Sequence, residues 1–86
     1  MKEIRRLLNI MDDLRTKCPW DKKQKTQSLK NLKIEEVYEL TEAVENGNFE
    51  NLKEELGDLL LHIVFYSKIA SEKKKFNFMD VVNDLC

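Results

Sequence analysis

Residues that interrupt helices are scarce in this chain, which contains one proline and two glycines among its 86 residues. Pro19 falls in the polar stretch "TKCPWDKKQKTQ", and Gly47 falls in the sequence "NGN" at residues 46–48. Both are typical places for a helix to stop. Charged residues make up 36% of the sequence and few positions are β-branched, which favours helices over sheet. The sequence therefore predicts long helices that are interrupted in only two places.

Apolar residues that recur every three or four positions predict where these helices lie. The first helix is expected over about residues 2–16, before the break at Pro19. The second is expected over about residues 28–45, with Ser28 as its N-cap. Gly47 suits the left-handed conformation that commonly ends a helix. The stretch between these two helices is predicted to be a polar loop.

The third helix, over about residues 50–74, is apolar on nearly every side of its middle, so we expect it to be central and most buried. A short loop joins it to the second helix, which places the two antiparallel. The fourth, over residues 79–85, is either truncated or completed by a partner chain. Residues 1–86 thus predict one all-α domain, an antiparallel bundle of about four helices. Because so short a chain buries only about two-thirds of its unfolded surface, self-association should complete the bundle.

The balance of charge excludes several classes of protein. The chain has 15 basic and 16 acidic residues, whereas a general nucleic-acid binder would show a basic excess. No apolar run approaches the roughly 20 residues needed to span a membrane, and the first residues are too charged for a signal peptide. Cys18 and Cys86 form neither a disulfide framework nor a zinc motif, so we interpret them as free thiols. We expect a cytoplasmic protein with no membrane or nucleic-acid partner.

The second helix carries a glutamate within its apolar stripe. At 3.6 residues per turn, Glu36 lies about 20° from Leu29 on the helical wheel. A carboxylate in a helix interface is costly unless a charged or hydrogen-bonding group meets it. Glu39 lies three residues further on the same face, and Glu35 lies beside them. The apolar stripe itself is formed by Leu29, Leu32, Leu40 and Ala43.

The third helix repeats this pattern, since Glu55 and Asp58 are three residues apart in an otherwise apolar stretch. Carboxylates converging from two antiparallel helices would repel each other, and either protonation or a divalent cation would relieve the repulsion. Carboxylate oxygens suit Mg²⁺ or Mn²⁺, and carboxylate-bound Mg²⁺ usually also engages substrate phosphates. These residues therefore favour a nucleotide or diphosphate substrate, although charged pairs on solvated helix faces are an alternative.

A di-iron site is not supported, because it needs two Glu-x-x-His motifs and the only histidine, His62, has the wrong spacing. His62 either contacts a ligand or forms a hydrogen bond within the helix interface.

Five motifs follow one another along the chain: "CPWD" at 18–21, "SL" at 28–29, "EEVYE" at 35–39, "EELGDLLLHIVFYSKIA" at 54–70 and "FNFMDV" at 76–81. In this order they resemble the motifs of MazG-type nucleoside triphosphate pyrophosphohydrolases. The resemblance implies an all-α, dimeric or tetrameric, Mg²⁺-dependent enzyme in which Mn²⁺ is a possible substitute. Such an enzyme cleaves nucleoside triphosphates between the α and β phosphates, giving a monophosphate and pyrophosphate, and serves to clean the nucleotide pool.

Carried over to this sequence, the resemblance implies that Glu36, Glu39, Glu55 and Asp58 are the metal ligands. Glu35 and Glu36 are then the predicted catalytic residues, with Glu35 either supporting the metal ligands without binding the ion or orienting the attacking water. Remaining carboxylate lone pairs are able to act as a general base toward a metal-bound water.

The loop from Trp20 to Lys25 is the predicted place of nucleotide contacts. Trp20 either stacks on a base or covers the core, and Lys22 and Lys25 either meet the triphosphate or belong to a solvated basic loop. His62 completes the predicted substrate-binding residues.

The chain departs from the family pattern in three places, one of which is that His62 and Tyr66 stand where Gln and His are common. Lys25 and Thr26 stand where Thr-His is frequent, and the chain ends at Cys86, before a basic segment of the type "RHPHVF". A truncated domain is therefore one interpretation. Besides the hydrolase, a non-catalytic dimerisation or regulatory module with a vestigial metal site remains an alternative, whereas the apolar face of the third helix is too broad for a coiled-coil scaffold.

Overall fold

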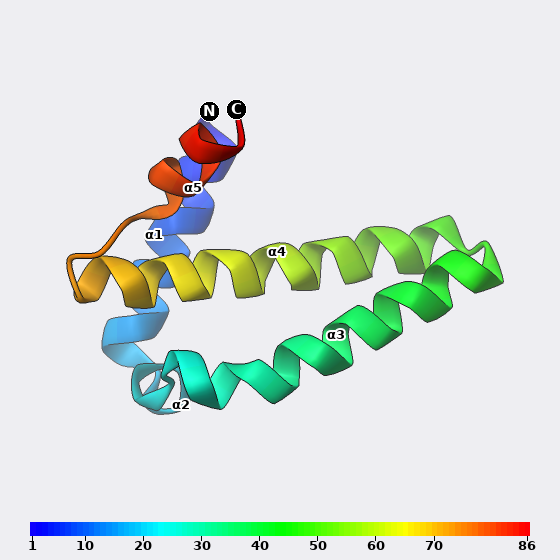
Figure 1. Cartoon of the computed structure of the whole chain (residues 1–86), viewed down its shortest axis with the longest axis horizontal. Coiled ribbons are helices and arrows are strands. Elements are labelled where there is room, and N and C mark those ends of the chain that lie inside the picture. Colours follow the sequence, from blue (N-terminus) through cyan, green and yellow to red (C-terminus); the bar gives the residue numbers. More distant parts are fainter.

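The computed structural model describes all residues from Met1 to Cys86, and every regular element in it is a helix (Figure 1). This confirms the predicted all-α class. None of the helices combines the length with the apolar character that crossing a membrane requires. The helices are α1 (Lys2–Lys17), α2 (Pro19–Lys23), α3 (Thr26–Asn46), α4 (Phe49–Glu72) and α5 (Phe78–Leu85).

The helix α2 is one more than the sequence predicted. The break at Pro19 is present, but Pro19 itself occupies the first position of a five-residue helix. A proline is tolerated there because the first residues of a helix have no intrahelical partner for their N–H groups. The polar stretch after α1 was therefore wrongly expected to be all loop, since proline both ends one helix and starts the next.

The start of α3 also differs from the expectation. The helix begins at Thr26 with Lys25 at the N-cap position, so Ser28 is not the N-cap. Ser28 instead lies at the third helical position, where its hydroxyl accepts a hydrogen bond of 2.8 Å from the backbone N–H of Lys25. The serine thus caps the helix from inside its first turn, which is the reciprocal half of a capping box.

The helices α3 and α4 form a long antiparallel hairpin, as the sequence predicted (Figure 1). Gly47 ends α3 with a φ of 66°, a left-handed conformation that glycine adopts without steric cost. Asn48 then begins α4, and its side chain accepts a hydrogen bond of 3.1 Å from the backbone N–H of Asn51. The short connection holds the two helices together at the tip of the hairpin, and they diverge toward the end that carries α2 (Figure 1).

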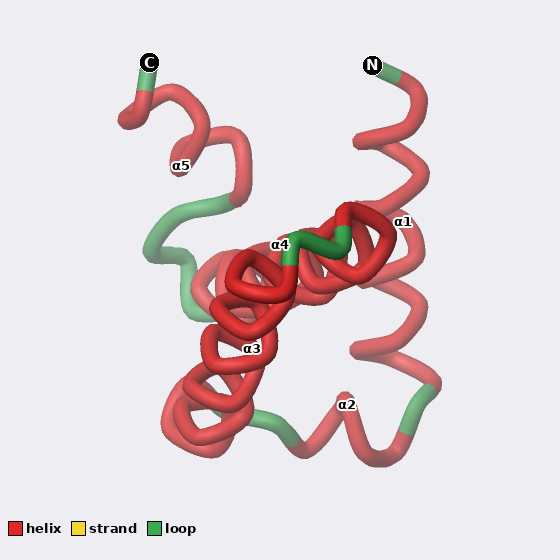
Figure 2. Tube along the Cα trace, turned by 90° about the vertical axis from the view of Figure 1, so that its right-hand side faces the viewer, coloured by secondary structure: helices red, strands yellow, loops and turns green.

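The core lies at one end of this hairpin, where α1 crosses it. Seen along the hairpin in Figure 2, α1 and α5 lie on either side of α4, and both pack against it. Five buried side chains form the main cluster: Met11, Leu29, Val64, Phe65 and Ile69.

Burial along α4 is uneven. The segment 64–70 contributes Val64, Phe65, Ser67, Ile69 and Ala70, which are five of the eight buried residues of the chain. The prediction that α4 is central is therefore confirmed for its second half. Its first half extends beyond α1 toward the tip of the hairpin, where only α3 lies against it (Figure 1).

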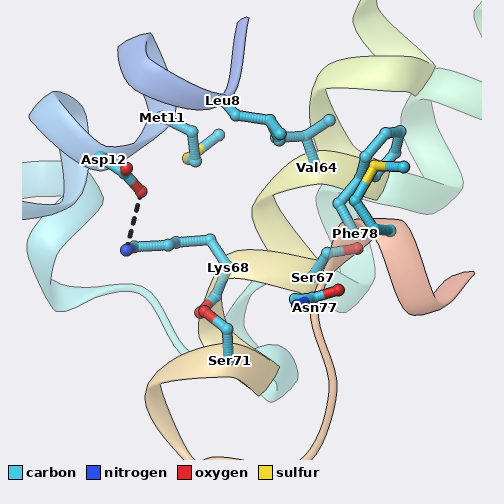
Figure 3. A pocket seen from close by; sticks show the side chains of 10 residues that line it. Leu8, Met11, Asp12, Val64, Ser67, Lys68, Ser71, Asn77 and Phe78 are labelled. Atoms are coloured by element: carbon cyan, nitrogen blue, oxygen red, sulfur yellow. Dashed lines mark hydrogen bonds and ion pairs between the residues drawn. The ribbon is translucent and has the colours of Figure 1, made fainter. Parts of the chain in front are cut away.

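A small pocket marks the junction of α1, α4 and α5 (Figure 3). Its volume is about 210 Å³. Leu8 and Val64 face each other across it, and Phe78 closes it from α5. Lys68 of α4 forms an ion pair of 2.8 Å with Asp12 of α1 at its edge. Lys68 follows Asp58 by ten positions, about 15 Å along the helix, so this junction lies away from the acidic residues of the hairpin.

Candidate metal centre

Three glutamates meet at the seam of the α3–α4 hairpin. Glu36 and Glu39 come from α3 and Glu55 from α4, and one carboxylate oxygen of each lies within 4.8 Å of the others. The three-residue spacing places the first two on one face of α3, and the antiparallel hairpin brings Glu55 opposite them. We call these three residues the acidic cluster. Its position confirms that the predicted carboxylate faces of the two helices are turned toward each other.

The acidic cluster and the nearby His62 contain polar atoms that the protein itself does not satisfy. One carboxylate oxygen of Glu36, one of Glu55 and the Nδ1 of His62 are buried and have no hydrogen-bond partner. Leaving such atoms unpaired away from water is costly, especially for a charged carboxylate. A hard cation between the carboxylates would supply the missing partner, and these residues therefore fit one.

The surroundings disfavour the negative charge of two of these carboxylates. Burial raises the pKa of Glu36, and the negative charges of Asp58 and Glu39 raise it further. Burial likewise raises the pKa of Glu55, followed by the effects of neighbouring Glu39, Glu36 and Asp58. Repulsion between like charges is the situation that a divalent cation reverses. The ligands are all oxygen atoms, which suit a hard ion such as Mg²⁺ or Mn²⁺.

Two of the predicted site residues lie at the edge of the acidic cluster. Asp58 follows Glu55 by one turn of α4 and is exposed; it is not among the three residues whose oxygens meet within 4.8 Å. Its charge nevertheless acts on Glu36. Glu35 is exposed on α3 and has a smaller effect on the same group.

A cavity of about 200 Å³ lies beside the acidic cluster, enclosed by the four helices α1 to α4. His62 lines this cavity and also acts electrostatically on Glu36, lowering its pKa. The cavity and the acidic cluster are therefore neighbours. Its lining is mostly apolar and consists of Met11, Leu14, Trp20, Asp21, Leu29, Leu61, His62 and Phe65.

The structure brings together two of the four predicted substrate-binding residues. Trp20 from α2 and His62 from α4 line the same cavity, and the side chain of Trp20 remains partly exposed. Lys22 and Lys25 are exposed, form no ion pair and do not line this cavity.

Arg15 and its partner Glu72 were not predicted from the sequence. Arg15 follows Met11 by four residues and Leu8 by seven, so it lies on the apolar stripe of α1. A charged residue in such a stripe was the signal that revealed Glu36, and the same signal would have revealed Arg15.

The fold and the site together define an all-α protein with a cluster of three carboxylates between two antiparallel helices. The sequence matches the family described as "MazG nucleotide pyrophosphohydrolase domain" over residues 24–86. The chain belongs to this family, which confirms the resemblance drawn from its motifs.

Similar proteins include the "Nucleoside triphosphate pyrophosphohydrolase/pyrophosphatase MazG" of Thermotoga maritima, which is 48% identical over 81 residues. That match covers 92% of this chain and 32% of the relative. The "Nucleoside triphosphate pyrophosphohydrolase" of Escherichia coli K12 is 43% identical over 89 residues, covering 100% of this chain and 32% of the relative. The chain thus spans about a third of the length of these two relatives.

A solved structure has a similar fold. The crystal structure of a mazG-related protein from Thermotoga maritima aligns with a TM-score of 0.81 and 28% sequence identity. The alignment covers 94% of this chain and 71% of the other.

Proposed function

We propose that this chain is a Mg²⁺-dependent nucleoside triphosphate pyrophosphohydrolase. Its reaction is the hydrolysis of a nucleoside or deoxynucleoside triphosphate between the α and β phosphates, which gives a monophosphate and pyrophosphate. The observation that carries the proposal is the acidic cluster, in which buried carboxylate oxygens of Glu36 and Glu55 lack a protein partner. Family membership and the names of the two relatives supply the substrate class.

Each acidic residue has a role in this proposal. Glu36, Glu39 and Glu55 hold the cation, and Asp58 completes the set from the edge of the cluster. When bound, Mg²⁺ supplies neutralisation of phosphate charge and a water of lowered pKa. Glu35 would orient the attacking water, and a free lone pair of Glu36 would accept its proton as the water oxygen attacks a phosphorus atom in line with the departing phosphate oxygen. The bond that would break joins the attacked phosphorus atom to the oxygen that bridges the α and β phosphates.

The cavity beside the acidic cluster is the proposed position of the nucleoside. Trp20 offers an aromatic face for a base, and His62 provides a polar group where the cavity meets the cluster. Lys22 lies in α2, the helix that carries Trp20, and Lys25 lies just after it. Both are exposed, and we propose that they contact the triphosphate. A cytoplasmic location agrees with a substrate drawn from the nucleotide pool and with a housecleaning role.

The uncovered half of the hairpin supports self-association, as a homodimer or homotetramer. Several large apolar side chains are exposed there, which is unusual for a surface that faces water. A second copy packing its own hairpin against this surface would complete a four-helix bundle. The exposed side chains of this half include Val37, Val44, Phe49, Leu56 and Leu60.

The test is Mg²⁺-dependent release of pyrophosphate across a panel of ribo- and deoxynucleoside triphosphates. We expect Glu36→Gln to lower kcat by about 100-fold or more, because it removes both a ligand and the proton acceptor. Glu42→Gln is the matched control, since Glu42 is exposed on the same helix and lies outside the acidic cluster. No pyrophosphate from any nucleotide with Mg²⁺ or Mn²⁺ would refute the proposal and favour the non-catalytic dimerisation module.

A further inference from the structure

Arg15 holds the carboxyl end of α2. It lies in the last turn of α1, and its side chain is 10% exposed. Its Nη1 donates hydrogen bonds of 2.6 Å to the backbone carbonyl of Asp21 and 2.9 Å to that of Gln24, with a longer one of 3.4 Å to that of Lys22. The last carbonyls of a helix have no partner within it, and a cation is favourable at this end. Gln24 caps this end in part, because its backbone N–H donates to the carbonyl of Asp21 and its side-chain amide donates to that of Trp20. Arg15 adds a charged donor to this cap, and this donor comes from another helix.

The other side of the same guanidinium is anchored to α4. Its Nε and Nη2 donate hydrogen bonds of 2.9 and 2.5 Å to the two carboxylate oxygens of Glu72. The guanidinium carbon also lies 5.7 Å from the centre of the Phe65 ring. This bidentate pairing uses two parallel N–H donors of the planar guanidinium group, which lysine does not possess. Arg15 is thus a bridge from the backbone of α2 to the last turn of α4.

The helix α2 has little else to fix its position. At five residues it is too short to be stable alone. Its backbone comes close to that of α1 and of no other helix, and Figure 2 shows it beside the lower end of α1. Yet α2 carries Trp20 and Asp21, which form one wall of the cavity that His62 of α4 also lines. The shape of this wall depends on where α2 is held relative to α4.

We propose that Arg15 is a positioning residue for the substrate pocket, and that its bridge to Glu72 fixes the wall formed by Trp20 and Asp21. The proposal rests on the proposed function, because the cavity bears on catalysis only if the nucleoside occupies it. Arg15 does not line the cavity, so it acts through α2 rather than by touching the substrate.

The chain offers a direct optical measure of this position, because Trp20 is its only tryptophan. The variants are Arg15→Lys, which keeps the charge and loses the fork, and the milder Glu72→Gln, which keeps a polar partner. Lys17→Gln is the matched control: Lys17 is also in the last turn of α1, and its ion pair with Asp13 is exposed. Circular dichroism establishes that each variant is folded. Acrylamide quenching of Trp20 and the kcat and KM for the best nucleotide are then measured.

We expect Arg15→Lys to raise the quenching constant of Trp20 and to raise KM roughly tenfold, as for loss of one charge-assisted hydrogen bond, with kcat little changed. Glu72→Gln should have the same effect to a smaller degree, and Lys17→Gln none. A lower melting temperature with unchanged quenching and KM would reveal a purely structural role and overturn the proposal. If the wild-type chain hydrolyses no nucleotide, the proposed function fails. The quenching of Trp20 then tests the positioning of α2 by itself, and an unchanged quenching constant in Arg15→Lys would refute that positioning.

Discussion

Mg²⁺ should raise the melting temperature of this protein, and Glu36→Gln should remove most of that rise. A ligand that binds only the folded state stabilises it, because the three carboxylates of the acidic cluster lie within 4.8 Å only when α3 and α4 are paired. At a Mg²⁺ concentration 100 times the dissociation constant, the added stability is about 2.7 kcal/mol. For a chain of 86 residues, the unfolding entropy near the melting temperature is roughly 0.18 kcal/mol/K. The expected rise is therefore about 15 °C.

The assay is thermal unfolding followed by circular dichroism across a Mg²⁺ titration at constant ionic strength. Without metal, Glu36→Gln should be at least as stable as the wild type, because it removes a charge that burial and Asp58 disfavour, as the raised pKa of Glu36 shows. Glu42→Gln should keep the full Mg²⁺ effect. An equal rise in wild type and Glu36→Gln, or the same rise with sodium at matched ionic strength, would refute this account of the acidic cluster.

Three further predictions concern stability and assembly. The Arg15 guanidinium lowers the pKa of Glu72 below its ordinary value of 4.5. The ion pair therefore stabilises the fold fully above pH 4.5, and this stabilisation is lost as the pH falls through the lowered pKa. In urea unfolding from about pH 6 to 3, the free energy of unfolding of Glu72→Gln should fall less than that of the wild type, and an equal fall would contradict this account. Leu29 is 1% exposed in the core, so Leu29→Ala should lower the free energy of unfolding by about 2–5 kcal/mol, measured from the urea midpoint. A decrease of less than about 1 kcal/mol would contradict its core position. Leu60→Glu should convert the proposed oligomer to a monomer in size-exclusion chromatography with light scattering, whereas an unchanged mass would place the interface elsewhere.

The helices themselves were encoded locally, and the sequence therefore predicted them well. Apolar spacing and the scarcity of glycine and proline depend only on neighbouring residues, so they indicated the long helices and the turn at Gly47. Glu36 was detectable for the same reason, because a carboxylate in an apolar stripe is a local contradiction that suggests a functional site. The sequence alone also carried the motifs that identify the family.

Only the tertiary structure decided how side chains from different helices meet. It placed Glu55 with Glu36 and Glu39 but left Asp58 at the edge. It also buried side chains only in the second half of α4, where α1 and α5 pack against this helix. It also revealed that Arg15 joins α2 to α4. Helical periodicity fixes the face on which a residue lies, but not the distance to a neighbouring helix. That distance depends on how the helices cross and pack, which is a property of the whole chain.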